Sequence, residues 1–154
     1  MRVWLLVVLA ACADGAVTGA ATSSVHPAAR SASTFVDNVS LADPPGTYRR
    51  WTIEIGDAPE GTDCQASGAP IIAIELYTIF DSAPRGFIPL SSDPPPRLFP
   101  AAFATVIDGI NVQGSVTISA ASTTRLIGTL TGTVTIDGGA HALDVAFDAP
   151  TCGP

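Results

Sequence analysis

The chain has 154 residues, a formal net charge of −7 and no Lys, so its seven basic residues are all Arg. This acidic balance argues against nucleic acid as a partner, because binding to nucleic acid depends on basic residues that neutralise phosphates. Without Lys the chain has no amine side chain for Schiff-base chemistry. Gly, Pro, Ser, Thr, Val and Ile are abundant, and this composition favours strands and turns over helices.

The N-terminus has the pattern of a secretory signal peptide. Met1-Arg2 forms a short basic segment, and an uncharged apolar run follows over Val3–Ala11. This run is too short for a transmembrane helix, which needs about 20 apolar residues. A short apolar core that ends in small residues is instead typical of a signal peptide that is removed on export.

Leu9-Ala10-Ala11-Cys12 resembles the lipobox of bacterial lipoproteins. The resemblance implies cleavage before Cys12 and attachment of a lipid to its sulfur, which would anchor the protein to a membrane. Cys12 is followed by Ala13 rather than Asp, which favours the outer membrane over the inner one. The alternative is ordinary cleavage after Ala13, which would release a secreted or periplasmic soluble protein.

Three regions are expected along the chain. Residues 1–11 form the lipoprotein signal peptide, and residues 12–33 form a tether rich in Ala, Ser, Thr and Gly. The tether lacks the large apolar residues that offset the entropy of ordering, so we expect it to be flexible. Residues 34–154 form one folded domain.

The folded domain shows the two-residue alternation of half-buried strands. Seven strands are predicted, over Phe35–Leu41, Trp51–Ile55, Ile71–Phe80, Ala102–Ile107, Asn111–Ala120, Leu126–Ile136 and Leu143–Asp148. Antiparallel sheets with one covered and one solvated face give this pattern. The predicted fold is all-β, a single antiparallel β-sandwich of about seven strands, and the alternative is a small closed β-barrel.

Cys64 and Cys152 are left as a pair if Cys12 carries lipid. In an oxidising compartment such a pair is expected to form a disulfide. The alternative, a zinc site, needs four ligands and has no nearby His to supply them.

Three segments resemble uncharacterised bacterial secreted β-lipoproteins, namely Gly114–Ile118, Arg125–Leu130 and Phe147–Cys152. The resemblance covers about the last hundred residues and rests on strand and turn patterns. It implies the β-fold and the Cys64–Cys152 disulfide. It implies no activity, because this family offers none to carry over.

The segment Asp81–Pro100 is predicted to be a long irregular loop stiffened by proline. It is a candidate contact loop, with Arg85, Phe87, Arg97 and Phe99 as the residues that would meet a partner protein, because Arg and Phe are common interface anchors. The other interpretation is a cover over the open end of the core, with both Phe side chains buried. We favour the cover, since a small sandwich with six Phe residues can rarely leave two in water.

No catalytic residues are predicted. His141 is the single His of the folded part and lies beside a Gly-rich turn. Asp144 and Asp148 share one face of a strand but lie about 13 Å apart, too far for shared acid–base work.

A weak calcium candidate is the loop cluster Asp57, Glu60 and Asp63, which does not follow the EF-hand order of ligands. Beyond it we predict no metal and no cofactor.

The sequence therefore predicts a non-enzymatic envelope protein that reaches the membrane through lipid on Cys12. It would act as a structural or protein-binding module, with another envelope protein as its partner. The alternatives are a small-ligand-binding β-barrel lipoprotein and a hydrolase with an unrecognised site.

Overall fold

The computed structural model describes residues 16–18, 31–42, 44–56, 64, 71–79, 82–92, 99–106 and 109–152. These residues form ten strands and no α-helix, which confirms the predicted all-β class. The strands are β1 (Ala16–Thr18), β2 (Ser31–Ala42), β3 (Pro45–Gly56), β4 (Ile72–Ile79), β5 (Gly86–Pro89), β6 (Ala101–Val106), β7 (Ile110–Asn111), β8 (Gln113–Ala121), β9 (Arg125–Ile136) and β10 (Gly139–Cys152).

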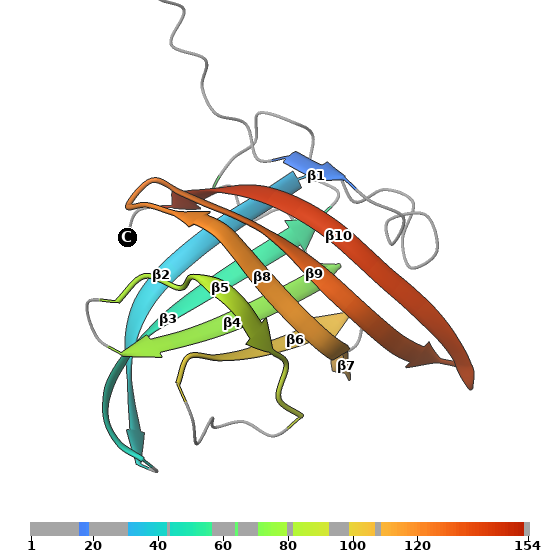
Figure 1. The fold of residues 1–154 in the computed structure, drawn as a ribbon, viewed down its shortest axis with the longest axis horizontal. Coiled ribbons are helices and arrows are strands. Elements are labelled where there is room, and N and C mark those ends of the chain that lie inside the picture. Colours follow the sequence, from blue (N-terminus) through green and yellow to red (C-terminus); the bar gives the residue numbers. More distant parts are fainter. Residues whose placement is uncertain are drawn as a thin grey trace, which may run out of the picture.

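The strands belong to one sheet that folds over on itself. The order along the sheet is β5-β8-β9-β10-β2-β3-β4-β6-β7, and β1 pairs with β10 beside this path. Figure 1 shows the resulting two layers, in which β8, β9 and β10 cross over β2, β3 and β4. All seven predicted strands are present, and β1, β5 and β7 are additional.

The two layers are joined where β10 ends. Most of β10 pairs antiparallel with β9, but Thr151 and Cys152 pair in parallel with Thr34 and Phe35 of β2. The sheet is therefore mixed, which corrects the expectation of a purely antiparallel arrangement. A strand can change partners in this way because its two edges carry separate rows of hydrogen-bonding groups.

The side chains between the two layers form one apolar core, as the alternation predicted. Fully buried members include Ile53, Ile55, Ile74, Leu76, Ile88, Val116, Leu126, Leu130, Leu143, Val145 and Phe147. Trp51 is also buried, in phase with Ile53 and Ile55. The core residues come from both layers, so neither layer could bury its apolar face alone.

The two ends of the sheet approach each other without closing it. Beyond β5, the Leu90 amide donates to the Gly114 carbonyl oxygen of β8 at 2.9 Å. The next amide, that of Ser91, donates to the Ala102 carbonyl oxygen of β6 at 2.8 Å. Leu90 and Ala102 form an isolated parallel bridge rather than a ladder. The sheet is thus open along the seam between β5 and β6.

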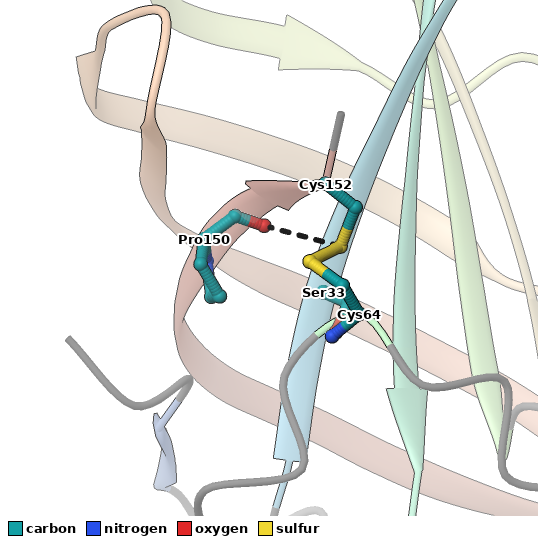
Figure 2. The surroundings of a disulfide bond; sticks show 4 residues. All are labelled: Ser33, Cys64, Pro150 and Cys152. Atoms are coloured by element: carbon teal, nitrogen blue, oxygen red, sulfur yellow. Dashed lines mark hydrogen bonds between the residues drawn. A yellow bond between two sulfur atoms is a disulfide. The ribbon is translucent and has the colours of Figure 1, made fainter. Parts of the chain in front are cut away.

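The predicted disulfide joins Cys64 to Cys152, with their Cα atoms 5.2 Å apart. Figure 2 shows it beside β2, where the Cys64 amide donates to the Ser33 hydroxyl oxygen at 3.3 Å. The Pro150 carbonyl oxygen lies 4.0 Å from the Cys152 sulfur. A disulfide sulfur carries no proton to donate, so this is a packing contact. The bridge clamps the short β10–β2 pairing that joins the layers.

Part of the segment predicted as a tether is described as strand. Ala16–Thr18 forms β1 and pairs antiparallel with Ala146–Asp148 of β10. Strand β2 begins at Ser31, before the expected domain boundary at residue 34. Backbone hydrogen bonds to neighbouring strands hold these segments, and Val17 and Ala32 also pack in or against the core. The signal peptide, Cys12 and the remainder of the tether lie outside the described residues.

Candidate functional site

A surface pocket of about 200 Å³ lies at the open seam of the sheet. Three pieces of chain line it: the end of β4 at Thr78 and Ile79, the segment 82–85 that leads into β5, and Phe99–Pro100 just before β6. Strands β4 and β6 are neighbours, whereas β5 belongs to the other layer. The pocket therefore forms where the chain passes from one layer to the other.

Hydrogen bonds fix the backbone at the base of this pocket. The Trp51 indole N–H donates to the Thr78 hydroxyl oxygen at 3.3 Å, and that hydroxyl donates to the Ser82 carbonyl oxygen at 2.7 Å. The Ser82 amide in turn donates to the Ile79 carbonyl oxygen at 2.9 Å. Thr78 is only 3% exposed, so its hydroxyl needs both partners. The chain reversal after β4 is thus anchored to the core.

An aromatic stack fixes another wall. The Phe99 ring lies against the Tyr48 ring, with centroids 4.1 Å apart and planes 7° apart. The Tyr48 hydroxyl donates to the Pro44 carbonyl oxygen at 3.2 Å, which holds Tyr48 to its own hairpin. One face of the Phe99 ring is therefore covered, and the side chain also lines the pocket.

Arg85 is the one charged residue among the described residues that line the pocket. Its side chain is exposed and makes no hydrogen bond or ion pair within the described ranges. Ile79, which is 62% exposed, contributes apolar surface to the same pocket. The described lining of the pocket thus combines apolar surface with one positively charged side chain.

A second polar cluster lies on the outer face of β2, β3 and β4. Arg50 holds Asp37 with two hydrogen bonds, 3.0 Å from Nε to Oδ1 and 2.6 Å from Nη2 to Oδ2. Next to them, the Tyr77 hydroxyl donates to Glu75 Oε2 at 2.6 Å. The Tyr77 ring meets the Phe103 ring edge to face, with centroids 5.8 Å apart.

The pKa shifts in this cluster indicate a structural role rather than a role in proton transfer. The hydrogen bond from Arg50 lowers the pKa of Asp37, and the same bond raises the pKa of Arg50. Burial, and after it Glu75, raise the pKa of Tyr77 to about 12. A carboxylate held ionised and a phenol held neutral are poor proton carriers near pH 7. The cluster therefore joins strands rather than serving as an acid–base centre.

The four candidate contact-loop residues differ in exposure and surroundings, where the structure describes them. Phe87 is 70% exposed, so the prediction that both Phe side chains cover the core is wrong for Phe87. The adjacent Ile88 is fully buried and takes the covering role. Phe99 is partly buried against Tyr48, Arg85 is exposed, and Arg97 lies outside the described residues. The loop also contains a strand, β5, which pairs with β8.

The remaining acidic residues considered in the sequence analysis do not form a catalytic pair where the structure describes them. Asp148 accepts two hydrogen bonds from Arg125, one of them 2.6 Å long from Nη2, whereas Asp144 is exposed. The weak calcium candidate, Asp57, Glu60 and Asp63, lies outside the described residues. In the part of the chain that is described, no three His, Cys, Asp or Glu side chains are placed to hold a metal.

Comparison with known proteins does not assign the chain to a family. No family model, curated protein or solved structure matches it at a significant level. Across the described ranges, no helix has the length and apolar character that a membrane span requires. The residues of the pocket and of β5 are therefore the basis for a functional proposal.

Proposed function

We propose that the protein is a non-enzymatic binding module held at the bacterial cell envelope by lipid on Cys12, with the β5 segment as its contact face for another envelope protein. The observation that carries the proposal is the 70% exposure of Phe87 next to the fully buried Ile88. Phe is among the residues enriched at the cores of protein interfaces, and the domain core does not use this side chain.

The position of β5 supports the same function. Among the described strands it is the last at its end of the sheet, and Gly86–Pro89 pairs with β8. Its buried Ile88 anchors the segment, so Phe87 is presented from a fixed backbone. A preorganised segment loses little conformational entropy on binding.

The disulfide supports an exported location. Disulfides persist in oxidising compartments such as the periplasm and are rare in the cytosol. A disulfide between Cys64 and Cys152 agrees with the signal peptide and lipobox read from the N-terminus. The residue after Cys12 is Ala13, which supports the outer membrane as the destination.

The alternatives have less support. A ligand inside the sheet would need an internal cavity, but buried side chains such as Leu130, Leu143 and Phe147 occupy the space between the layers. A hydrolase would need an activated nucleophile or a carboxylate pair. The carboxylates of Asp37 and Asp148 are held by Arg50 and Arg125 instead.

Lipidation is tested by mass spectrometry of the full chain purified from membranes of a bacterial host. The expected product begins at Cys12 and carries added lipid mass, and a Cys12→Ala variant should move to the soluble fraction. An unlipidated N-terminus at Asp14 in wild-type protein would contradict the anchor.

The contact face is tested with a photo-crosslinking amino acid placed at Phe87 in the host envelope. The control position is Ala142, which is exposed on β10, three strands away from β5. We expect a discrete adduct from position 87 and none from position 142. The same adducts from both positions, or none from either, would overturn β5 as the contact face.

A further inference from the structure

The pocket at the open seam is separate from Phe87, which does not line it. Its volume of about 200 Å³ limits what can enter. An apolar cavity of about 150 Å³ holds a benzene molecule, and pockets for drug-sized ligands are about 300–1,000 Å³. The pocket therefore has room for one ring or branched side chain with a small polar group attached.

Much of the described lining of the pocket is apolar, and its position is already fixed. Phe99 is held by its stack on Tyr48, and Ile79 presents apolar surface beside it. Pro84 and Pro100 also line the pocket, and a proline ring restricts the backbone around it. Such a site needs little rearrangement to accept an apolar group.

Arg85 determines the charge of the occupant. Elsewhere in the described ranges, Arg50 and Arg125 each hold a carboxylate with two hydrogen bonds, on Asp37 and Asp148. Arg85 makes no such pair there, although the chain has a net charge of −7 and acidic residues outnumber basic ones two to one. A guanidinium group matches a carboxylate through two parallel hydrogen bonds. The partner that Arg85 lacks within the described chain can be supplied by a ligand.

We propose that this pocket binds an apolar carboxylate, with its ring or branched group against Phe99 and Ile79 and its carboxylate on Arg85. Two sources share this chemistry: a free aromatic acid, and the C-terminal residue of another protein. The net negative charge of the chain disfavours ligands that carry several negative charges.

The test is a titration of the purified full chain, followed by calorimetry and by NMR shifts of the Ala83, Arg85 and Phe99 amides. The probes are phenylacetate, its neutral isostere phenylacetamide, and N-acetylphenylalanine, which mimics a C-terminal residue. We expect saturable binding of a carboxylate probe and at least tenfold weaker binding of phenylacetamide. Tighter binding of phenylacetate indicates a free acid, and tighter binding of N-acetylphenylalanine indicates a protein C-terminus.

Arg85→Gln should weaken binding of the carboxylate probe at least tenfold. Arg125→Gln is the matched control, because it removes the same charge from the outer face of β9 and should leave binding within twofold of wild type. Because phenylacetamide tests the charge requirement on the wild-type protein, the result does not depend on either variant folding. Absence of saturable shifts with both carboxylates, or equal binding of phenylacetate and phenylacetamide, would overturn the proposal.

Discussion

The Phe99 ring reaches past the end of β4 to stack on the Tyr48 ring of β3, with centroids 4.1 Å apart. Tyr48 is the register partner of Ile79, the last residue of β4. The stack therefore fastens the segment before β6 to a strand that is not its neighbour in the sheet. The stack fixes one wall of the pocket. Phe99 is thus held by the fold, whereas Phe87 is exposed to solvent.

A double-mutant cycle should detect this stack. Offset or parallel aromatic pairs contribute about 0.5–1.5 kcal/mol beyond their buried area. Tyr48→Leu and Phe99→Leu, made singly and together, should therefore show a coupling free energy of that size in urea unfolding. The control cycle pairs Tyr48→Leu with Phe87→Leu and should be additive within about 0.5 kcal/mol. Additivity in both cycles would show that the stack adds nothing to stability.

Phe87 and Ile88 are adjacent residues with opposite exposure, and this gives a matched comparison. Ile88 is fully buried, so Ile88→Ala should lower the free energy of unfolding by about 2–5 kcal/mol. Phe87 is 70% exposed, so Phe87→Ala should change it by no more than about 0.5 kcal/mol. Thermal and urea unfolding measure both. A large loss of stability for Phe87→Ala would mean that the side chain covers the core and cannot be an anchor for a partner.

The strands that could be predicted are those that bury alternate side chains over several residues. Val112, Val116 and Ile118, for example, all point into the core, as their spacing indicates. Strand β5 has only four residues and one buried side chain, Ile88, so its sequence cannot show the two-residue alternation of a longer strand. Pro84 just before the strand and Pro89 at its end also give this segment the composition of a loop.

The hairpin between β9 and β10 follows a short local signal. The sequence has two Asp-Gly pairs that favour a hairpin turn, Asp108-Gly109 and Asp137-Gly138, and Asp108 lies outside the described residues. The two-residue turn that the structure describes is Asp137–Gly138, with φ values of 51° and 78°. Positive φ at both central residues is typical of a type I′ turn, which an Asp-Gly pair can adopt. The other Asp-Gly pair comes between β6 and β7, which pair antiparallel with Val106 opposite Ile110, so both Asp-Gly pairs lie between neighbouring antiparallel strands.

The pocket could not be predicted because no local pattern encodes it. Ile79, Arg85 and Phe99 come together only because β6 pairs with β4 while β5 pairs with β8. That order depends on the packing of the whole sheet rather than on any one segment. Arg85 and Phe99 were recognisable as candidate contact residues, but their meeting with Ile79 was not.

Loss of the disulfide should destabilise the domain. Cys64→Ser and Cys152→Ser should differ in how much stability they lose. Closing a loop with a sequence separation of 88 is expected to contribute about 4–5 kcal/mol before native strain is subtracted. Both Cys64→Ser and Cys152→Ser remove this constraint. Cys152 is only 6% exposed, so its replacement also buries a hydroxyl group, at a cost of about 1–3 kcal/mol when no hydrogen bond forms. We expect Cys152→Ser to have the lower urea midpoint, and equal midpoints would contradict this.

Gly128 should not tolerate a side chain. A Cβ atom at this position would lie 2.7 Å from Phe147 Cζ and 2.7 Å from the Thr117 carbonyl oxygen. The buried ring and the neighbouring strand would have to shift, and overpacking of this kind costs about 1–3 kcal/mol. Gly128→Ala should therefore lower the melting temperature. Gly56→Ala is the control, because its Cβ would meet only Ser31 Oγ, at 3.8 Å, and its melting temperature should equal or exceed that of wild type.

The Tyr77 hydroxyl provides a pH-dependent test of the outer cluster. Burial and the hydrogen bond to Glu75 raise the pKa of Tyr77 from its ordinary value of 10.0 to about 12. Between pH 10 and pH 12 the unfolded chain has lost this proton while the native protein keeps it. The contribution of Tyr77 to stability is therefore complete below pH 10 and is lost as the pH rises towards 12.

The composition of the chain makes this loss measurable. The chain has no Lys and only two Tyr residues, and its Arg residues stay charged, so few other side chains lose a proton in this pH range. Tyr77→Phe keeps the ring against Phe103 and removes the ionisable group. The free energy of unfolding of wild type, measured in urea from pH 9 to pH 11.5, should fall more steeply above pH 10 than that of Tyr77→Phe. The limiting difference in slope is about 1.4 kcal/mol per pH unit for one proton. Parallel curves would show that the Tyr77 hydroxyl titrates in the native state as it does in the unfolded chain, and that its hydrogen bond to Glu75 does not protect it.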